Sequence, residues 1–353
     1  MSTRRRLSLP ILTLLMLLGT ACSGGGVEEA TNDDEAIAPV AGAQTPANER
    51  PVQFEGAGKV KLFGTLSMPA TDAGATVPGV LMIPTSGAGG VLGPAGVADP
   101  LGKDLAKTFT DAGVAAYRYD QRGTGQSKLE PDVRLSFDDL VADARAGLDL
   151  MAQRRETAGR DLAVVGYDQG GLVALRLAAT DPRVKRLVLI STPGRSLLEV
   201  RASQLQERYG AESAAALRTE VANLIASRSV PPLDQLRTEL RPMLPAQEAG
   251  FLADLYALDP TVDAARVRVP TMIVVPSDPA PYDPQRLAGA IPGAQVVTST
   301  GGGSTLVISG PTPEDLSNPT SANHEHGAAP PVAPTTRDAA TLERVARFVG
   351  ATP

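Results

Sequence analysis

The sequence predicts an α/β protein with a mostly parallel central sheet, helices on both faces of that sheet and an inserted helical cap. Short apolar runs of strand length alternate with amphipathic segments of helical length along most of the chain, which is typical of a parallel sheet covered on both faces. Between residues 195 and 265 the strand-like runs stop and apolar residues recur at helical spacing, which indicates the cap. With 353 residues, 42% of them hydrophobic, the chain is long enough for one large core.

The elements follow in a regular order. The expected strands are an opening hairpin at 52–54 and 59–63, then 77–83, 114–119, 161–165, 184–190, 271–275 and 295–297. The expected helices of the core are 101–112, 137–154, 171–179 and 339–349. Gly-Ala-Gly at 56–58 separates the two arms of the hairpin, as a tight connection requires.

This order divides the chain into seven parts. They are a signal peptide (1–21), a flexible tether (22–50), the first part of the core (51–194), the cap (195–265), the second part of the core (266–300), a Gly/Pro-rich loop (301–336) and a C-terminal helix (337–353). The tether is rich in Gly, Ala, Pro and acids and has no apolar periodicity. The long loop, with a short strand-like piece at 305–308, is of a kind that is usually functional or mobile.

The N-terminus has the composition of a targeting segment. Three arginines at 4–6 precede an apolar run from Leu7 to Leu18, which is short for a membrane span. Leu18-Gly-Thr-Ala-Cys22 resembles the lipobox of bacterial lipoproteins, whose cysteine is acylated after cleavage; an ordinary secretory peptide cut near Ala21 is the alternative. Cys22 is the only cysteine, so we expect lipidation there, an extracytoplasmic protein anchored to the cell membrane, and no disulfide.

Composition argues against several partners. The formal charge is −6, and it becomes −9 when the leader with its three arginines is removed. Basic residues are not clustered beyond the leader, and aromatic residues make up 3% of the chain with no Trp. We therefore expect no binding of nucleic acid and no cofactor. The two histidines, His324 and His326, are not grouped with other metal ligands, so no metal site is expected.

Two motifs carry the chemistry. Gly166-Tyr-Asp-Gln-Gly170 has the small-x-nucleophile-x-small pattern of a nucleophile elbow, between an expected strand and an expected helix. Tyr117-Arg-Tyr-Asp-Gln-Arg-Gly-Thr-Gly-Gln-Ser127 closely resembles a segment of bacterial α/β-hydrolase esterases related to serine aminopeptidases. The resemblance covers roughly residues 50 to 300 and implies the α/β-hydrolase fold. Within the second motif, Asp120, Arg122 and Gly123 are expected to fix a loop rather than to react.

The family's catalytic positions carry over incompletely. The resemblance places the nucleophile at Asp168, where the family has Ser, and the triad acid at Asp278. It implies oxyanion donors at the backbone N–H of Gln169 and at Thr85 or Ser86. The family's histidine position holds Ser304, and His324 comes about 20 residues later in the Gly/Pro-rich loop.

Asp at the elbow has two interpretations. The first is the covalent aspartate of haloalkane dehalogenases and epoxide hydrolases, with His324 activating water; Tyr209 and Tyr256 are then the candidate leaving-group donors. The second is loss of the serine from an esterase scaffold, which the vacated histidine position favours. A serine mechanism relocated to Ser86 or Ser304 is a third possibility, although neither lies in an elbow. We therefore expect an esterase-like lipoprotein that lacks ordinary serine-esterase activity and binds a small apolar or ester-like ligand or a partner. The alternative is an active hydrolase that uses Asp168 as covalent nucleophile, or a weak carboxylesterase.

Overall fold

The computed structural model describes residues 48–72, 74–84, 100–130, 133–157, 159–278, 283–302, 306–309 and 336–350. The strands are β1 (Glu49–Glu55), β2 (Lys61–Ser67), β3 (Gly79–Ile83), β4 (Ala115–Tyr119), β5 (Leu162–Tyr167), β6 (Val184–Ile190), β7 (Thr271–Val275), β8 (Gln295–Thr298), β9 (Val307–Ser309) and β10 (Thr336–Arg337). The helices are α1 (Pro100–Asp111), α2 (Phe137–Gln153), α3 (Gln169–Thr180), α4 (Leu197–Tyr209), α5 (Ala211–Ser227), α6 (Ala249–Ala257), α7 (Pro260–Ala264), α8 (Gln285–Ala290) and α10 (Ala339–Gly350). The expected elements of the core are all present, and β1 begins two residues before the expected start of the fold.

The first eight strands form one sheet in the order β1-β2-β4-β3-β5-β6-β7-β8. The β1–β2 and β2–β4 pairs are antiparallel, and the other pairs are parallel. The prediction of a mostly parallel sheet is therefore confirmed. Because parallel strands end on the same side, the carboxyl ends of β3 to β8 share one edge of the sheet, which we call the carboxyl edge. Ligands of open α/β sheets bind at this edge.

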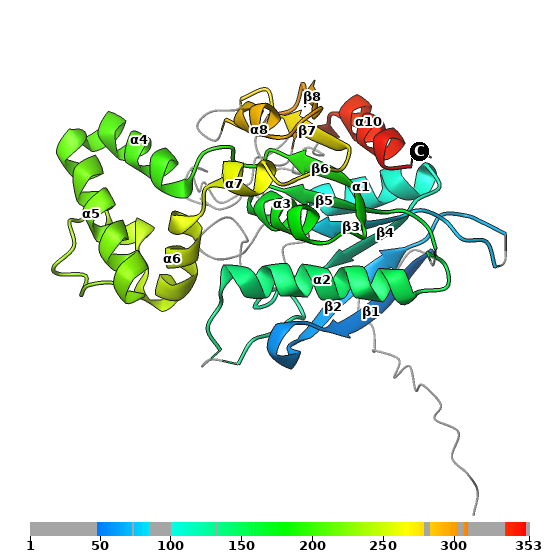
Figure 1. Cartoon of the computed structure of the whole chain (residues 1–353), viewed down its shortest axis with the longest axis horizontal. Coiled ribbons are helices and arrows are strands. Elements are labelled where there is room, and N and C mark those ends of the chain that lie inside the picture. The colour runs from blue at the N-terminus through cyan, green and yellow to red at the C-terminus, as the bar shows by residue number, and fades with distance from the viewer. Residues whose placement is uncertain are drawn as a thin grey trace, which may run out of the picture. The chain divides into compact units, whose positions relative to one another are not determined.

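Helices cover both faces of the sheet (Figure 1). The apolar side chains of α2 and α3 pack on one face with strand residues such as Leu81, Val164 and Leu189. Those of α1 and α10 pack on the other face with the alternate strand residues, such as Met82, Val165 and Val188. Strands buried on both faces account for the nearly continuous apolar runs in the sequence.

The segment between β6 and β7 folds as the expected helical cap. Helices α4, α5 and α6 enclose a small apolar core of their own, whose members include Leu205, Leu217 and Leu252. In Figure 1, α4 and α5 project to one side of the sheet, and α6 lies between them and the body of the protein. Helix α6 joins the two cores, because its Phe251 and Leu255 pack with the main core while Leu252 packs with the cap.

The ends of the Gly/Pro-rich loop lie together. Strands β9 and β10 pair in antiparallel fashion, with Thr336 opposite Ser309 and Arg337 opposite Val307. The backbone N–H of Asp338 also donates to the carbonyl of Leu306 at 3.4 Å. The loop therefore leaves and rejoins the described part of the chain at one two-stranded stem, a pairing that periodicity alone did not predict.

Candidate active site

Asp168 occupies a nucleophile elbow. It lies alone between the end of β5 and the start of α3, with φ 52° and ψ −126°, a backbone conformation that costs energy for any residue except glycine. Its N–H donates to the carbonyl of Ile190 at 2.9 Å, and its own carbonyl accepts from Gly171 at 3.0 Å. The side chain is half-buried. The sharp strand–turn–helix geometry that exposes a nucleophile is thus present, with a carboxylate at its tip.

Two glycines make this turn possible. A Cβ atom on Gly166 would lie 2.5 Å from the carbonyl oxygen of Gly170 and 2.6 Å from the Cβ of Ala174. A Cβ atom on Gly170 would lie 2.2 Å from the carbonyl oxygen of Pro84 and 2.3 Å from that of Ile83. The flanking glycines of the motif are therefore required by close packing of α3 against β5 and against the end of β3.

Asp278 lies at the same edge as Asp168. It follows β7 by three residues, and β7 is separated from β5 by β6 alone. With strands about 4.8 Å apart, the ends of β5 and β7 lie about 10 Å apart. The structure therefore brings the predicted nucleophile position and the predicted acid to the same edge of the sheet, with one strand between them.

The loop after β8 lies against Asp278. The N–H of Ser277 donates to the carbonyl of Gly301 at 3.0 Å, and the N–H of Ser299 donates to the carbonyl of Val275 at 2.8 Å. A Cβ atom on Gly302 would be 2.9 Å from Oδ1 of Asp278. This loop leads directly to the position that the family resemblance assigns to histidine. Ser304, which stands at that position, and His324 lie outside the described residues.

The predicted oxyanion donors lie partly within the described residues. Gln169 is the first residue of α3, so its N–H belongs to the helix N-terminus, where backbone N–H groups and the helix dipole favour negative charge. Thr85 and Ser86 lie outside the described residues. Pro84 immediately precedes them and packs against Gly170, which places this point of the chain beside the elbow.

The two candidate tyrosines of the cap lie in different surroundings. Tyr209 ends α4 with 49% of its surface exposed, and the guanidinium of Arg208 lies 5.4 Å from its ring centroid. Tyr256 is buried in the core of the cap, and its hydroxyl donates to the carbonyl of Met243 at 3.1 Å. Burial raises the pKa of Tyr256 to about 12. Their interpretation as leaving-group donors is therefore not supported, since one hydroxyl is engaged within the cap and the other tyrosine is exposed at the end of α4.

The loop of Asp120, Arg122 and Gly123 is held by buried polar contacts. Arg122 donates from Nε and Nη2 to the carboxylate of Asp143, at 2.6 and 2.5 Å, and from Nη2 to the carbonyl of Ala57. Asp120 accepts from the N–H of Gln126 at 2.8 Å. These contacts agree with the structural role expected from the sequence. Asp143 was missed, although an acid on the apolar face of a helix is the signal that would have found it.

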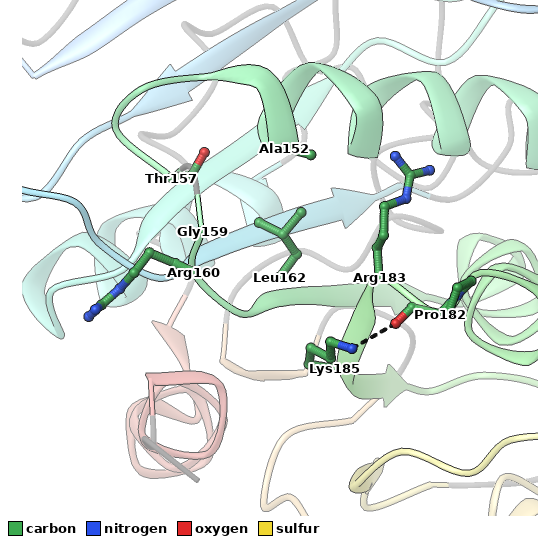
Figure 2. Close-up of a pocket in the computed structure, with 8 residues that line it drawn as sticks. All are labelled: Ala152, Thr157, Gly159, Arg160, Leu162, Pro182, Arg183 and Lys185. Carbon is green, nitrogen blue, oxygen red and sulfur yellow. Dashed lines mark hydrogen bonds between the residues drawn. The ribbon is translucent and has the colours of Figure 1, made fainter.

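The pocket in Figure 2 is not the site. It has a volume of about 240 Å³ and is lined by Ala152, Thr157, Gly159, Arg160, Leu162, Pro182, Arg183 and Lys185. Leu162 is the first residue of β5, so this pocket lies at the amino end of the strand whose carboxyl end carries Asp168. Its cations do not converge: Arg183 pairs with Asp149 and Asp181, and Lys185 donates to the carbonyl of Pro182.

Two further features of the described residues concern metal binding and membrane insertion. Among the described residues, no three His, Cys, Asp or Glu side chains gather as a metal site would require. No helix in the described part of the chain combines the length and the apolar character needed to cross a bilayer. Cys22, His324 and His326 lie outside that part.

Known proteins share this architecture. Residues 100–273 match the family model described as serine aminopeptidase, S33. A protein of Variovorax paradoxus that bears the name carbamate hydrolase is 39% identical over 82 residues, 23% of this chain and 29% of the relative, so the match spans less than a third of that relative.

Two solved structures are similar over 85% of this chain and 98% of their own. They are DcsB in complex with a substrate analogue (TM-score 0.54, 17% identity) and a hydrolase from Pseudomonas aeruginosa (TM-score 0.50, 20% identity). At identities this low, the two structures are evidence for a shared fold alone. Together, the sheet order, the elbow at Asp168 and these matches assign the chain to the α/β-hydrolase superfamily, in its esterase-like branch.

Proposed function

We propose that this protein is a lipid-anchored, extracytoplasmic member of the esterase-like branch that lacks ordinary serine-esterase activity and binds a small apolar or ester-like ligand beneath its cap. The observation that carries the proposal is the carboxylate of Asp168 at the tip of an otherwise intact elbow. The fold and the elbow keep the geometry of a hydrolase site, whereas the side chain at its centre has changed its chemistry.

A carboxylate is a poor replacement for serine in ester hydrolysis. A serine hydroxyl, deprotonated by histidine, attacks the ester carbonyl and forms an ester intermediate. Attack by Asp168 on the same carbonyl would form an anhydride, which is as reactive as the bond being cleaved or more so. Turnover of esters by this route is therefore expected to be negligible.

The anchor is proposed from the sequence. The lipobox-like segment ends at Cys22, and the acid-rich, Pro-rich stretch up to the start of β1 has the composition of a tether. Cys22→Ala is expected to move the protein from the membrane fraction to the soluble fraction of its host. Mass spectrometry of the N-terminal peptide, which gains a diacylglycerol if Cys22 is modified, distinguishes this outcome from an ordinary secretory leader.

The ester test compares the wild-type protein with Asp168→Ala. We expect no hydrolysis of p-nitrophenyl acetate or butyrate above the level of Asp168→Ala. A p-nitrophenyl carbamate belongs in the same panel, because the Variovorax relative is named for that activity. Turnover by the wild type that Asp168→Ala abolishes would contradict the proposal. The matched control is Asp161→Ala, an acid at the opposite end of the same strand.

A second function is favoured by the retained strain at the elbow. Asp168 has a positive φ, and Asp278 follows β7, where the family resemblance implies the triad acid. A carboxylate is already ionised at neutral pH and attacks an alkyl carbon without a base. An oxygen of Asp168 would bond to the carbon of an epoxide and the ring C–O bond would break, which leaves an alkyl ester of Asp168 and an alkoxide that must take a proton from a donor such as a tyrosine hydroxyl or water. Water, activated by His324 with Asp278, would then hydrolyse that ester.

This second function is tested by trapping. Styrene oxide is incubated with the wild type and with Asp168→Asn, and the peptide containing residue 168 is examined by mass spectrometry. A covalent adduct on the wild type alone, or release of the diol with turnover, would establish the covalent aspartate and overturn the non-catalytic proposal. We expect neither adduct nor diol, because the cap tyrosines do not provide the proton for the alkoxide.

A further inference from the structure

Asp338 joins three segments at the carboxyl edge. It follows β10, precedes α10 and has 6% of its surface exposed. On the helix side, its carboxylate accepts from the N–H of Thr341 at 3.1 Å and from the Thr341 hydroxyl at 2.7 Å. On the other side, it accepts from the hydroxyl of Ser299 at 2.9 Å and from the N–H of Thr300 at 2.8 Å. The two bonds from Thr341 are those of a helix cap, and the two bonds from Ser299 and Thr300 hold a separate loop.

The loop that Asp338 holds is the one that lies against Asp278. The hydroxyl of Ser299 also accepts from the N–H of Gly301 at 2.9 Å, so the Asp338 contact continues into the turn. The carbonyl of Gly301 in turn accepts from the N–H of Ser277, the neighbour of Asp278. A continuous series of hydrogen bonds therefore runs from the base of α10 through residues 299–301 to the loop of the triad acid.

The charge of Asp338 strengthens this series. Burial tends to raise the pKa of Asp338, but the hydrogen bonds from Thr341, Thr300 and Ser299 outweigh burial and hold the pKa below its usual range. The carboxylate is therefore ionised at neutral pH. Hydrogen bonds to an ionised acceptor are shorter and about twice as strong as neutral ones.

We propose that Asp338 is a positioning residue of the active site: through Ser299 and Thr300 it fixes residues 299–302 against Asp278 and so sets the place of the triad acid. The inference rests on the second, hydrolytic form of the proposed function for the role of Asp278 as a triad acid. It goes beyond a capping role for Asp338, because two of its four hydrogen bonds hold the loop, and a helix cap does not require these two.

The test follows backbone amide exchange by NMR in the full chain. Asp338→Asn removes the charge and one carboxylate oxygen, and the amide of Ser277 is expected to exchange about tenfold faster or more. Ser299→Ala removes the loop-side bond to Asp338 together with the bond that the N–H of Gly301 donates to the Ser299 hydroxyl, and it should accelerate exchange at Ser277 in the same direction. Thr341→Val is the matched control, since it removes a helix-side bond alone and should leave Ser277 unchanged while it accelerates exchange in the first turn of α10.

Two results would overturn the proposal. One is unchanged exchange at Ser277 in both Asp338→Asn and Ser299→Ala. The other is an equal acceleration at Ser277 in Thr341→Val, which would mean that Asp338 acts only by stabilising α10. If Asp338→Asn does not fold, Ser299→Ala carries the comparison, because it loses a single hydroxyl. The readout needs neither ligand nor turnover, so esterase activity through Asp168 would contradict the proposed function and leave this result intact.

Discussion

At position 168, the backbone explains why an aspartate is compatible with the elbow. Positive φ values are disfavoured for most side chains, and Asp is among the residues that tolerate them best. The N–H of Asp168 keeps its bond to Ile190, and Gly171 keeps its bond to the carbonyl of Asp168. Replacement of serine by aspartate therefore leaves the turn intact and changes its chemistry.

The glycine next to the elbow tolerates no side chain. Gly170→Ala would bring a methyl group to 2.2 Å from the carbonyl oxygen of Pro84, and we expect a loss of about 3 kcal/mol in the free energy of unfolding. Gly289→Ala is the matched control, since it lies in α8 with nothing within 4 Å of the added methyl. That variant should gain up to about 1 kcal/mol. Urea unfolding measures both, and equal effects would contradict the argument.

Three buried tyrosines differ in whether their hydroxyls have a hydrogen-bond partner. The hydroxyls of Tyr117 and Tyr119 are buried without a hydrogen-bond partner among the described residues, whereas Tyr256 donates to Met243. Tyr117→Phe is therefore expected to leave stability unchanged or to raise it by about 1 kcal/mol, because an unpaired buried hydroxyl is costly. Tyr256→Phe should cost about 1 kcal/mol. Thermal unfolding distinguishes the two, and a marked loss in Tyr117→Phe would indicate a buried water that binds the hydroxyl.

At the scale of the elements, the ion pair between Arg122 and Asp143 connects three segments of the chain. Arg122 lies after β4 and Asp143 lies on α2, and both are almost fully buried. The carboxylate of Asp143 also accepts from the N–H of Ala57 at 2.9 Å, in the short connection between β1 and β2. The pair therefore ties the opening hairpin and the loop after β4 to α2, on the side of the sheet that supports the site.

Removal of one partner of this pair would leave a buried charge unpaired and lower the stability of the protein. Arg122→Ala is expected to lower the free energy of unfolding by about 3–5 kcal/mol, because the carboxylate of Asp143 is left buried and unpaired. Lys107→Ala, which breaks an exposed pair with Asp111 on α1, should cost about 0.5 kcal/mol or less. Chemical unfolding measures both. A loss in Arg122→Ala as small as that in Lys107→Ala would show that the pair is not a structural tie.

For the molecule as a whole, two buried carboxylates with lowered pKa values make stability depend on pH in the acid range. Hydrogen bonds from Arg183 lower the pKa of Asp181, and the bonds described above hold that of Asp338 low. A group with a lowered folded pKa stabilises the fold above its unfolded pKa, about 3.9 for Asp. That stabilisation is lost as the pH falls through the folded pKa. The two acids thus contribute fully at neutral pH and progressively less below about pH 4.

The difference in the free energy of unfolding between Asp338→Asn and the wild type isolates the contribution of Asp338. The free energy of unfolding of Asp338→Asn is expected to lie below that of the wild type by a constant amount above about pH 5. The gap should narrow as the pH falls below about 4. Unfolding by urea at a series of pH values gives the gap directly. A gap that is the same at pH 3 and pH 7 would show that the pKa of Asp338 is not lowered by folding.

Much of the architecture could be predicted from local patterns. Apolar runs in β5, β6 and β7 predicted strands because a strand buried on both faces needs apolar side chains at every position. The glycines around Asp168 predicted the elbow because a close approach of backbones excludes side chains. The role of Arg122 was also predictable in kind, although its pairing with Asp143 was not, since the contact depends on how α2 packs against the loop after β4.

The sequence by itself determined the fold class, the elbow with its aspartate and the acid after β7, since each depends on the residues of one short segment. Only the tertiary structure decided that Tyr256 is buried within the cap, that the ends of the Gly/Pro-rich loop meet at one stem, and that Asp338 binds the loop beside Asp278. These are contacts between residues that are far apart in the chain. They depend on how the elements pack, which local periodicity and spacing do not encode.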